Sequence, residues 1–226
     1  MTVKICASII APSFRDIVRM VTKAEKNGAD LLEVRMDYLQ ELESLKNIRE
    51  LSTLPMIATN RPLREGGLFN DSEEKRIQIL DAAIDLDFDF IDVELSTLTS
   101  DVLVQRIKDR GAKVIISYHY QDSTPNLYEL NLIFKQELRT RPDICKIVTS
   151  AKRFKDNITC LKFVEKAYQR TKVICFSMGE LGLTSRLLSP ILGGYLTYAS
   201  VEKGKESALG QLTVADMRSF YNMLGV

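Results

Sequence analysis

The stretch Lys113-Val-Ile-Ile-Ser-Tyr-His119, KVIISYH, is one of eight short apolar runs that decide the fold. Its centre is a near-continuous run of β-branched residues, Val114 to Ile116. A strand with one face in water alternates apolar and polar residues, whereas a parallel strand covered on both faces does not. The run therefore predicts a buried parallel strand. The only histidine of the chain, His119, lies where this strand should end.

Seven further runs of this kind recur along the chain. They are KICASII (4–10), LLEVR (31–35), MIATNR (56–61), FIDVEL (90–95), DICKIVT (143–149), KVICFSM (172–178) and GYLTYAS (194–200). The intervening segments carry helix signals, such as Ser13 as an N-cap and Gly28 as a C-terminal stop. Eight strands alternating with helices in 226 residues predict an α/β fold, the (β/α)8 TIM barrel of eight parallel strands with outer helices.

A doubly wound open sheet is the alternative architecture for the same alternation. That fold commonly carries G-x-G-x-x-G after its first strand, and no such motif follows residues 4–10. Eight evenly spaced repeats also favour closure into a barrel. No linker or low-complexity segment divides the chain, so we expect residues 1–226 to form one catalytic barrel domain.

Composition argues against several classes of partner. The 31 Lys and Arg residues nearly balance 30 Asp and Glu residues, so no overall field attracts nucleic acid or an anionic membrane. No apolar run approaches the roughly 20 residues that span a bilayer, and no signal-peptide pattern is present. The cysteines form no CxxC pair, which favours reduced thiols and a cytoplasmic location. A single histidine excludes a His-rich metal site, and we expect no metal or cofactor.

Polar side chains recur at every second position in four of the runs, while their neighbours are apolar. The polar sets are Glu33, Arg35 and Asp37; Thr59 and Arg61; Asp92 and Glu94; and Ser117 and His119. Because helices cover the outside of a barrel, this parity should face the lumen. The polar residues gather toward the C-terminal ends of the strands, where barrel enzymes carry their active sites. The polar residues of any one strand could equally form a structural ion-pair network in the lumen, with no catalytic role. The same pattern on four strands favours an active site.

The run DICKIVTS (143–150) places Lys146 in the middle of a covered strand. Desolvating an ammonium group costs several kcal/mol unless it is paired or neutral, and a neutral amine is a nucleophile for carbonyl carbon. His119 on the neighbouring strand can serve as acid and base, although a lone histidine beside aromatic residues is more often a packing residue. The two residues together predict a barrel enzyme that forms a Schiff base.

The motifs EVRMD, TNRPLREGG, IDVE, SYH, CKIV, GLTSR and SALGQ resemble, in order and spacing, those of the type I 3-dehydroquinate dehydratases. The resemblance covers nearly the whole chain. It implies a (β/α)8 barrel, a homodimer, and no metal or cofactor. It also implies a lyase of the shikimate pathway of aromatic amino acid biosynthesis, which converts 3-dehydroquinate to 3-dehydroshikimate by syn elimination through a lysine Schiff base.

The resemblance also implies roles for individual residues. Lys146 resembles the imine-forming lysine, His119 the general acid and base, and Glu65 the carboxylate beside that histidine. Arg186 resembles the arginine that binds the substrate carboxylate. The residues that match those holding the substrate hydroxyls and closing the pocket are Glu33, Arg35, Arg61, Ser207 and Gln211. Leu209 departs from the pattern, because many relatives have proline there. The segment 201–211 is polar, and we expect it to form a lid.

Two other functions remain open from the residues. A class I aldolase would also use Lys146, but it usually handles phosphorylated sugars. No obvious phosphate-binding loop follows the seventh or eighth run, although Gly182 lies in a suitable place. A catalytically silent barrel that binds a small acid is the second alternative. An unreactive Lys146 in a protein that still binds the acid would indicate it.

Overall fold

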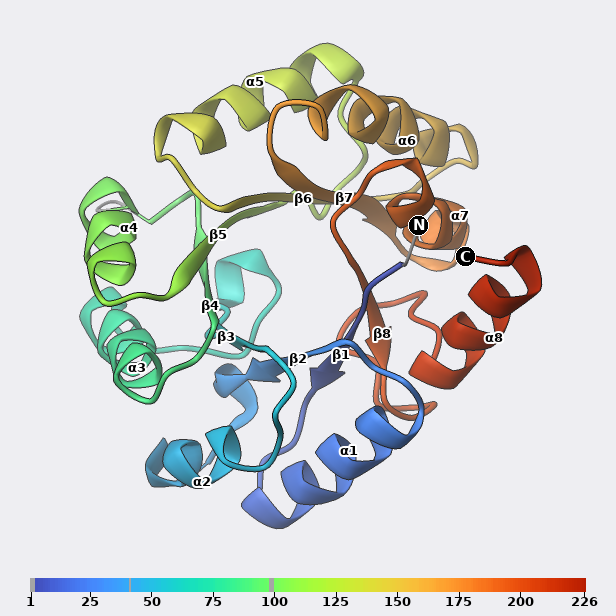
Figure 1. Cartoon of the computed structure of the whole chain (residues 1–226). Helices are drawn as coiled ribbons and strands as arrows, with labels where there is room; N and C mark the ends of the chain where they lie inside the picture. The colour runs from blue at the N-terminus through green and yellow to red at the C-terminus, as the bar shows by residue number, and fades with distance from the viewer. Residues whose placement is uncertain (1–2, 41, 98–99) are drawn as a thin grey trace.

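Eight parallel strands form a ring at the centre of the molecule, and helices surround them (Figure 1). The computed structural model describes residues 3–40, 42–97 and 100–226. Its strands are β1 (Ile5–Ile9), β2 (Leu31–Arg35), β3 (Met56–Thr59), β4 (Phe90–Glu94), β5 (Lys113–His119), β6 (Ile144–Ser150), β7 (Lys172–Met178) and β8 (Thr197–Ser200). All eight predicted strands are confirmed, with boundaries that differ by a few residues.

The strands pair in parallel in the order β7-β6-β5-β4-β3-β2-β1-β8, so each strand lies beside its neighbour in the chain. No ladder joins β7 to β8 within the described residues, but the Tyr195 N–H just before β8 donates to the Val173 carbonyl of β7 at 2.8 Å. This contact brings the two edges of the sheet together. The prediction of a TIM barrel is therefore confirmed, and the open doubly wound sheet is wrong.

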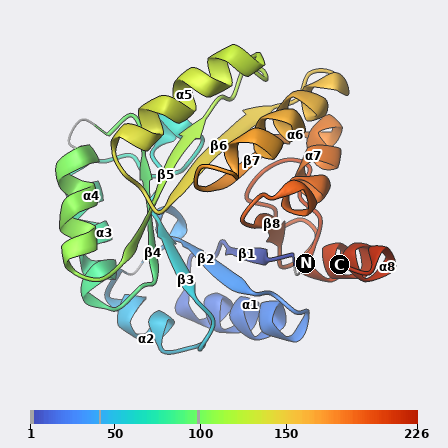
Figure 2. The same cartoon turned by 45° about the horizontal axis from the view of Figure 1, so that its top comes forward.

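The helices lie around the outside of the barrel (Figure 2). They are α1 (Phe14–Lys26), α2 (Leu45–Arg49), α3 (Glu73–Asp85), α4 (Ser100–Asp109), α5 (Leu127–Arg139), α6 (Lys155–Ala167), α7 (Leu183–Leu188) and α8 (Val214–Leu224). Ser13 caps α1 as predicted, because its side chain accepts from the Asp16 N–H, and Gly28 follows the helix in the left-handed region. In the described part of the chain, no helix is long and apolar enough to cross a membrane.

Side chains divide by parity between the two faces of each strand. The outward residues, such as Ile5, Val34 and Ile116, form a core with the helices. The inward residues at the lower end of the barrel are apolar: Cys6, Leu31, Ile57, Phe90, Ile115, Ile144, Ile174 and Leu196. Further along the even-numbered strands lie Glu33, Asp92, Lys146 and Tyr198. The barrel therefore has an apolar floor with a polar layer above it.

Candidate active site

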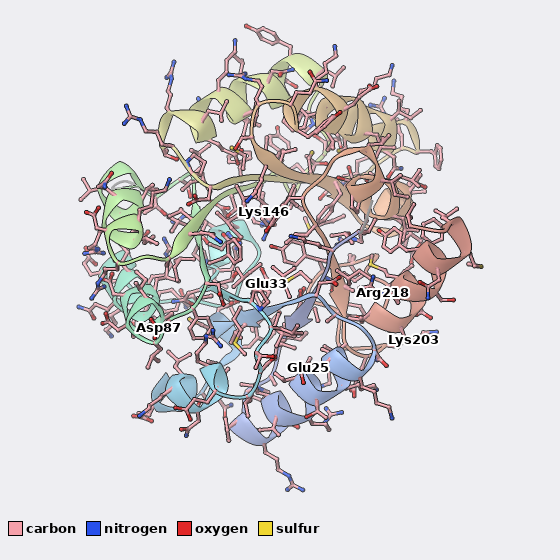
Figure 3. All side chains as sticks on the ribbon, viewed as in Figure 1. Glu25, Glu33, Asp87, Lys146, Lys203 and Arg218 are labelled. Carbon is pink, nitrogen blue, oxygen red and sulfur yellow. The ribbon has the colours of Figure 1, made fainter. Side chains whose placement is uncertain are left out.

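A cavity of about 500 Å³ opens above this polar layer, at the C-terminal ends of the strands. All nine predicted site residues line it: Glu33, Arg35, Arg61, Glu65, His119, Lys146, Arg186, Ser207 and Gln211. Figure 3 shows Lys146 and Glu33 inside the ring of strands. The fold thus brings together residues that are up to 178 positions apart in the chain, from Glu33 to Gln211.

Lys146 lies on the floor of the cavity, on β6, and is 4% exposed. Its Nζ donates to Asp92 Oδ2 at 2.9 Å and lies 3.5 Å from Glu33 Oε1. The Nζ is also 4.4 Å from the centre of the Tyr198 ring. The lysine is therefore paired by carboxylates rather than isolated, which makes its burial tolerable. Asp92 was predicted to face the lumen, but its contact with Lys146 was not foreseen.

Arg61 links the carboxylates around the lysine. Its Nη2 lies 2.9 Å from Asp92 Oδ1, and its Nη1 donates to Glu94 Oε1 at 2.7 Å and to Ser117 Oγ at 2.8 Å. Burial alone would raise the pKa of Asp92. The positive charges of Arg61 and Lys146 nevertheless hold this pKa well below its ordinary value. Asp92 is therefore an anion at neutral pH, placed to keep both cations oriented.

His119 and Glu65 form the second functional pair, 3.1 Å apart between Nδ1 and Oε2. The other Glu65 oxygen accepts from Ser96 Oγ at 2.6 Å. Burial lowers the pKa of His119 to about 4, and the nearby charge of Arg61 adds to the effect. A neutral imidazole beside a carboxylate keeps its proton on Nδ1, so Nε2 is left as a base. This arrangement fits a proton acceptor that works at neutral pH.

Two glycines place Glu65. Gly66 has a φ of +78°, and a Cβ at Gly67 would lie 1.9 Å from the Arg61 carbonyl oxygen. Gly67 thus packs against the backbone of Arg61, while Gly66 lines the cavity. The Phe69 N–H then donates to the same carbonyl at 3.1 Å. Only glycine fits at positions 66 and 67, and the tight turn that they allow places Glu65 beside His119.

Arg186 of α7 is 1% exposed and lies over the Phe176 ring at 4.3 Å. Its Nη1 donates to the Tyr198 carbonyl at 3.4 Å, while Nε and Nη2 have no hydrogen-bond partner among the described residues. Burial lowers the pKa of Arg186 to about 10, which leaves the guanidinium charged at neutral pH. A buried cation with free donors in a cavity is suited to an anionic ligand.

Glu33 and Arg35 of β2 are both held in place by neighbours. Glu33 accepts from Ser8 Oγ and from Thr59 Oγ1, each at 3.1 Å. Arg35 makes a two-point contact with Asp37, at 2.8 Å from Nε and 2.6 Å from Nη2. The fork of Arg35 is therefore already engaged, whereas that of Arg186 is not.

The predicted lid covers part of the cavity mouth. Ser207 and Gln211 bind each other, with the Ser207 N–H donating to Gln211 Oε1 at 2.8 Å. The Leu209 side chain is 79% exposed, but its carbonyl accepts from the Gly179 N–H at 3.0 Å. At the other end of the segment, Glu202 lies 3.0 Å from Lys23 of α1. The lid is thus attached both to the loop after β7 and to α1.

Arg76 of α3 is a residue that sequence reasoning missed. It is completely buried, and its Nη1 pairs with Glu94 and donates to the Asn60 carbonyl at 3.3 Å. Its Nη2 donates to Glu73 at 2.6 Å and to Thr97 Oγ1 at 2.9 Å. The segment around it reads as an ordinary polar helix, so no local pattern distinguishes Arg76 from its solvated neighbours.

Residues 5–226 match the profile of the family described as type I 3-dehydroquinase. The chain belongs to this family. A 3-dehydroquinate dehydratase of Methanopyrus kandleri is 35% identical over 225 residues, which are 98% of this chain and 100% of that relative. The chloroplastic bifunctional 3-dehydroquinate dehydratase/shikimate dehydrogenase of Arabidopsis thaliana is 38% identical over 96% of this chain, which spans only 36% of that longer protein.

Solved structures of type I 3-dehydroquinases have the same fold. The 3-dehydroquinate dehydratase of Geobacillus kaustophilus superposes with a TM-score of 0.92 at 26% identity, over 100% of this chain and 92% of the other. The type I enzyme of Clostridium difficile, solved with covalently modified comenic acid, has a TM-score of 0.88 at 26% identity, over 98% and 91% of the two chains.

Proposed function

We propose that this chain is a lyase that dehydrates 3-dehydroquinate to 3-dehydroshikimate through a Schiff base on Lys146. The activity is that of a type I 3-dehydroquinate dehydratase in the shikimate pathway. One observation carries the assignment of the nucleophile. Lys146 is the lysine on the floor of the barrel cavity, where it faces His119 and the unpaired nitrogens of Arg186 across the same space.

Lys146 supplies the covalent step. After it loses a proton, its Nζ lone pair forms a bond to the C3 ketone carbon, and the ketone oxygen departs as water. The resulting iminium withdraws electrons from the adjacent carbon and so acidifies a C2 hydrogen. Asp92 and Glu33 balance the positive charge of the iminium as they balance that of the free ammonium.

His119 then transfers protons. Its neutral Nε2 takes the C2 proton, and the C2 electron pair moves into the iminium to give an enamine. The enamine electrons then return, so that a C1–C2 double bond forms and the iminium is restored as the C1–O bond breaks. The C1 hydroxyl leaves as water with the proton that His119 took. Glu65 holds the imidazole by Nδ1 and stabilises its transient positive charge. The imine is finally hydrolysed, which frees the product and Lys146. One histidine of low pKa is sufficient for this sequence.

Arg186 receives the substrate carboxylate. Its free Nε and Nη2 form the planar edge that matches two carboxylate oxygens. Glu33, Arg35, Arg61, Ser207 and Gln211 surround the rest of the ligand. A class I aldolase would use the same lysine, but membership of the type I 3-dehydroquinase family favours the dehydratase.

We also infer that residues 1–226 form one catalytic domain, that the protein acts as a homodimer, and that it works in the cytoplasm without a metal or cofactor. The four cysteines support a reducing compartment, because all are buried free thiols. Among the described residues, no group of three or more His, Cys, Asp or Glu side chains is arranged to hold a metal ion, and the carboxylates of the polar layer are paired with Lys146 and Arg61 instead.

Borohydride reduction in the presence of 3-dehydroquinate tests the proposal. Reduction converts an imine to a stable secondary amine, so we expect loss of activity and an adduct on the peptide that contains Lys146. Lys146→Met should give no adduct, whereas Lys155→Met, which changes an exposed lysine of α6, should behave as the wild type. An adduct on other lysines alone, or full turnover with none, would refute the imine.

His119→Ala separates the two chemical events. Imine formation should survive, so borohydride should still label Lys146, but turnover should fall by roughly 10² to 10⁴ with the loss of a general acid and base. A histidine that only packs would show the opposite pattern, with lower stability and nearly normal turnover in the folded fraction. A folded His119→Ala variant with normal turnover would therefore remove His119 from the mechanism.

A further inference from the structure

Tyr198 lies beside Lys146 in the polar layer of the barrel, although neither the motifs nor the parity of charged residues pointed to it. It is on β8, is 3% exposed, and lines the cavity. Its ring centre is 4.4 Å from Lys146 Nζ, which is a cation–π distance. The ring is therefore a third neighbour of the ammonium, in addition to Asp92 and Glu33.

The hydroxyl group of Tyr198 is buried and has no hydrogen-bond partner among the described residues. Tyr221 provides a contrast, because its hydroxyl donates to the Leu187 carbonyl at 2.8 Å. A buried tyrosine usually finds such a partner, and an unpaired one is unfavourable for folding. Tyr198 thus lines the cavity beside the nucleophile and carries a buried donor that no described group binds. Burial and the charge of Glu33 raise the pKa of Tyr198 well above its ordinary value, so the donor keeps its proton.

We propose that the Tyr198 hydroxyl binds the ketone oxygen of the substrate at the carbon that Lys146 attacks. The inference rests on the function proposed above. When Nζ bonds to the carbonyl carbon, the π electron pair moves onto the oxygen, and a hydrogen bond from Tyr198 stabilises the charge that develops there. Tyr198 donates the hydrogen bond but retains its own proton. The oxygen leaves as water after it takes one proton from Nζ and one from solvent, the latter replacing the proton that the ammonium gave up before attack. The ring meanwhile holds Nζ under the ketone carbon.

Tyr198→Phe tests this assignment, because it removes the hydroxyl and keeps the ring. We expect kcat/KM to fall roughly three- to tenfold, the loss of one neutral hydrogen bond. The rate at which borohydride captures the Lys146 adduct in a single turnover should fall by a similar factor. The melting temperature should stay the same or rise, since the hydroxyl has no partner in the free protein. Tyr195→Phe, which alters a ring packed on Lys4 before β8, should leave the kinetics unchanged.

Tyr221→Phe supplies the reference for a structural tyrosine, and it should lower the melting temperature because the Leu187 carbonyl loses its donor. If Tyr198→Phe behaves in that way, or fails to fold, its hydroxyl is structural and the proposal is wrong. Unchanged kinetics in a stable Tyr198→Phe protein would overturn it as well. A wild-type protein that forms no adduct and does not turn over 3-dehydroquinate would instead refute the proposed function.

Discussion

Arg186 combines near-complete burial with two nitrogens that no described protein group binds. Burying the Arg186 guanidinium is unfavourable in the free protein, and stacking on Phe176 reduces this unfavourable free energy. An anionic ligand would satisfy the remaining donors. Arg218 of α8 is different, because its Nε donates to the Gly28 carbonyl at 3.2 Å and its Nη2 donates to Asp30 Oδ2 at 2.6 Å. The two arginines therefore differ in the donors that the protein leaves free for a ligand.

We therefore expect Arg186→Lys to weaken substrate binding by roughly ten- to a hundredfold, since lysine keeps the charge but lacks the planar fork. Its melting temperature should change little. The matched variant Arg218→Lys should lower the melting temperature and leave KM unaltered. Steady-state kinetics and thermal unfolding of both variants check the prediction, which is wrong if Arg186→Lys binds normally but melts early.

The low pKa of His119 predicts the acid limb of the activity profile. With the neutral form as the proposed base, kcat/KM should remain nearly constant from pH 7 to well below pH 6.5 and fall as the pH passes through about 4. In the unfolded chain the imidazole has its ordinary pKa of 6.5, so the free energy of unfolding should decrease as the pH falls from 6.5 to about 4. That contribution should be absent in His119→Gln. Half-loss of kcat/KM near pH 6.5 would contradict the assignment.

Among the elements, α3 contributes to the polar layer through Arg76. This arginine forms an ion pair with Glu94, and Glu94 also pairs with Arg61. Without Arg76, the buried carboxylate of Glu94 would have only Arg61 as a positively charged partner. We expect Arg76→Met to cost about 3–5 kcal/mol of unfolding free energy, and Glu94→Gln in the same chain to restore part of it. Arg106→Met, which breaks a partly exposed pair between α4 and Asp81 of α3, should cost about 1 kcal/mol or less. Purely additive effects of Arg76→Met and Glu94→Gln in urea unfolding would disprove the coupling.

The lid is the second element with a testable role. Glu202 ties it to Lys23 and Arg19 of α1 at the exposed end of the segment. Saturating substrate should slow tryptic cleavage after Lys203 and Lys205, because ligand contacts with Ser207 and Gln211 would hold the lid closed. Glu202→Gln should be cleaved faster both with and without substrate. Equal cleavage rates of the wild type in the two conditions would argue against closure over the ligand.

At the scale of the molecule, the barrel supplies all the proposed chemistry from its own side chains. Strong chelators should therefore leave turnover unchanged, because no described cluster offers three ligands to a divalent ion. The measurement is dehydratase activity before and after incubation with EDTA and removal of the chelator. A loss that added zinc or magnesium restores would show that the class of mechanism is wrong.

The strands, the barrel fold and nine residues that line the cavity could be predicted from the sequence alone. Near-continuous runs of Val, Ile and Leu identify strands covered on both faces, and strict alternation separates lumen residues such as Glu33 and Asp92 from helix-facing residues such as Val34. Both signals depend on neighbours within a few positions, so they can be read along the chain. The motifs around Lys146, His119 and Arg186 then selected the family.

Only the tertiary structure decided which of these groups are partners. The pairing of Lys146 with Asp92, the reach of Arg76 from α3 to Glu94, and the unpaired hydroxyl of Tyr198 each depend on the length and direction of side chains from distant elements. Tyr198 occupies an inward position of its strand like many other barrel residues. No feature of the neighbouring sequence shows that its hydroxyl lacks a hydrogen-bond partner. Hydrogen bonds and ion pairs form between groups a few ångströms apart in space, and strand order and helix packing, rather than separation along the chain, determine those distances.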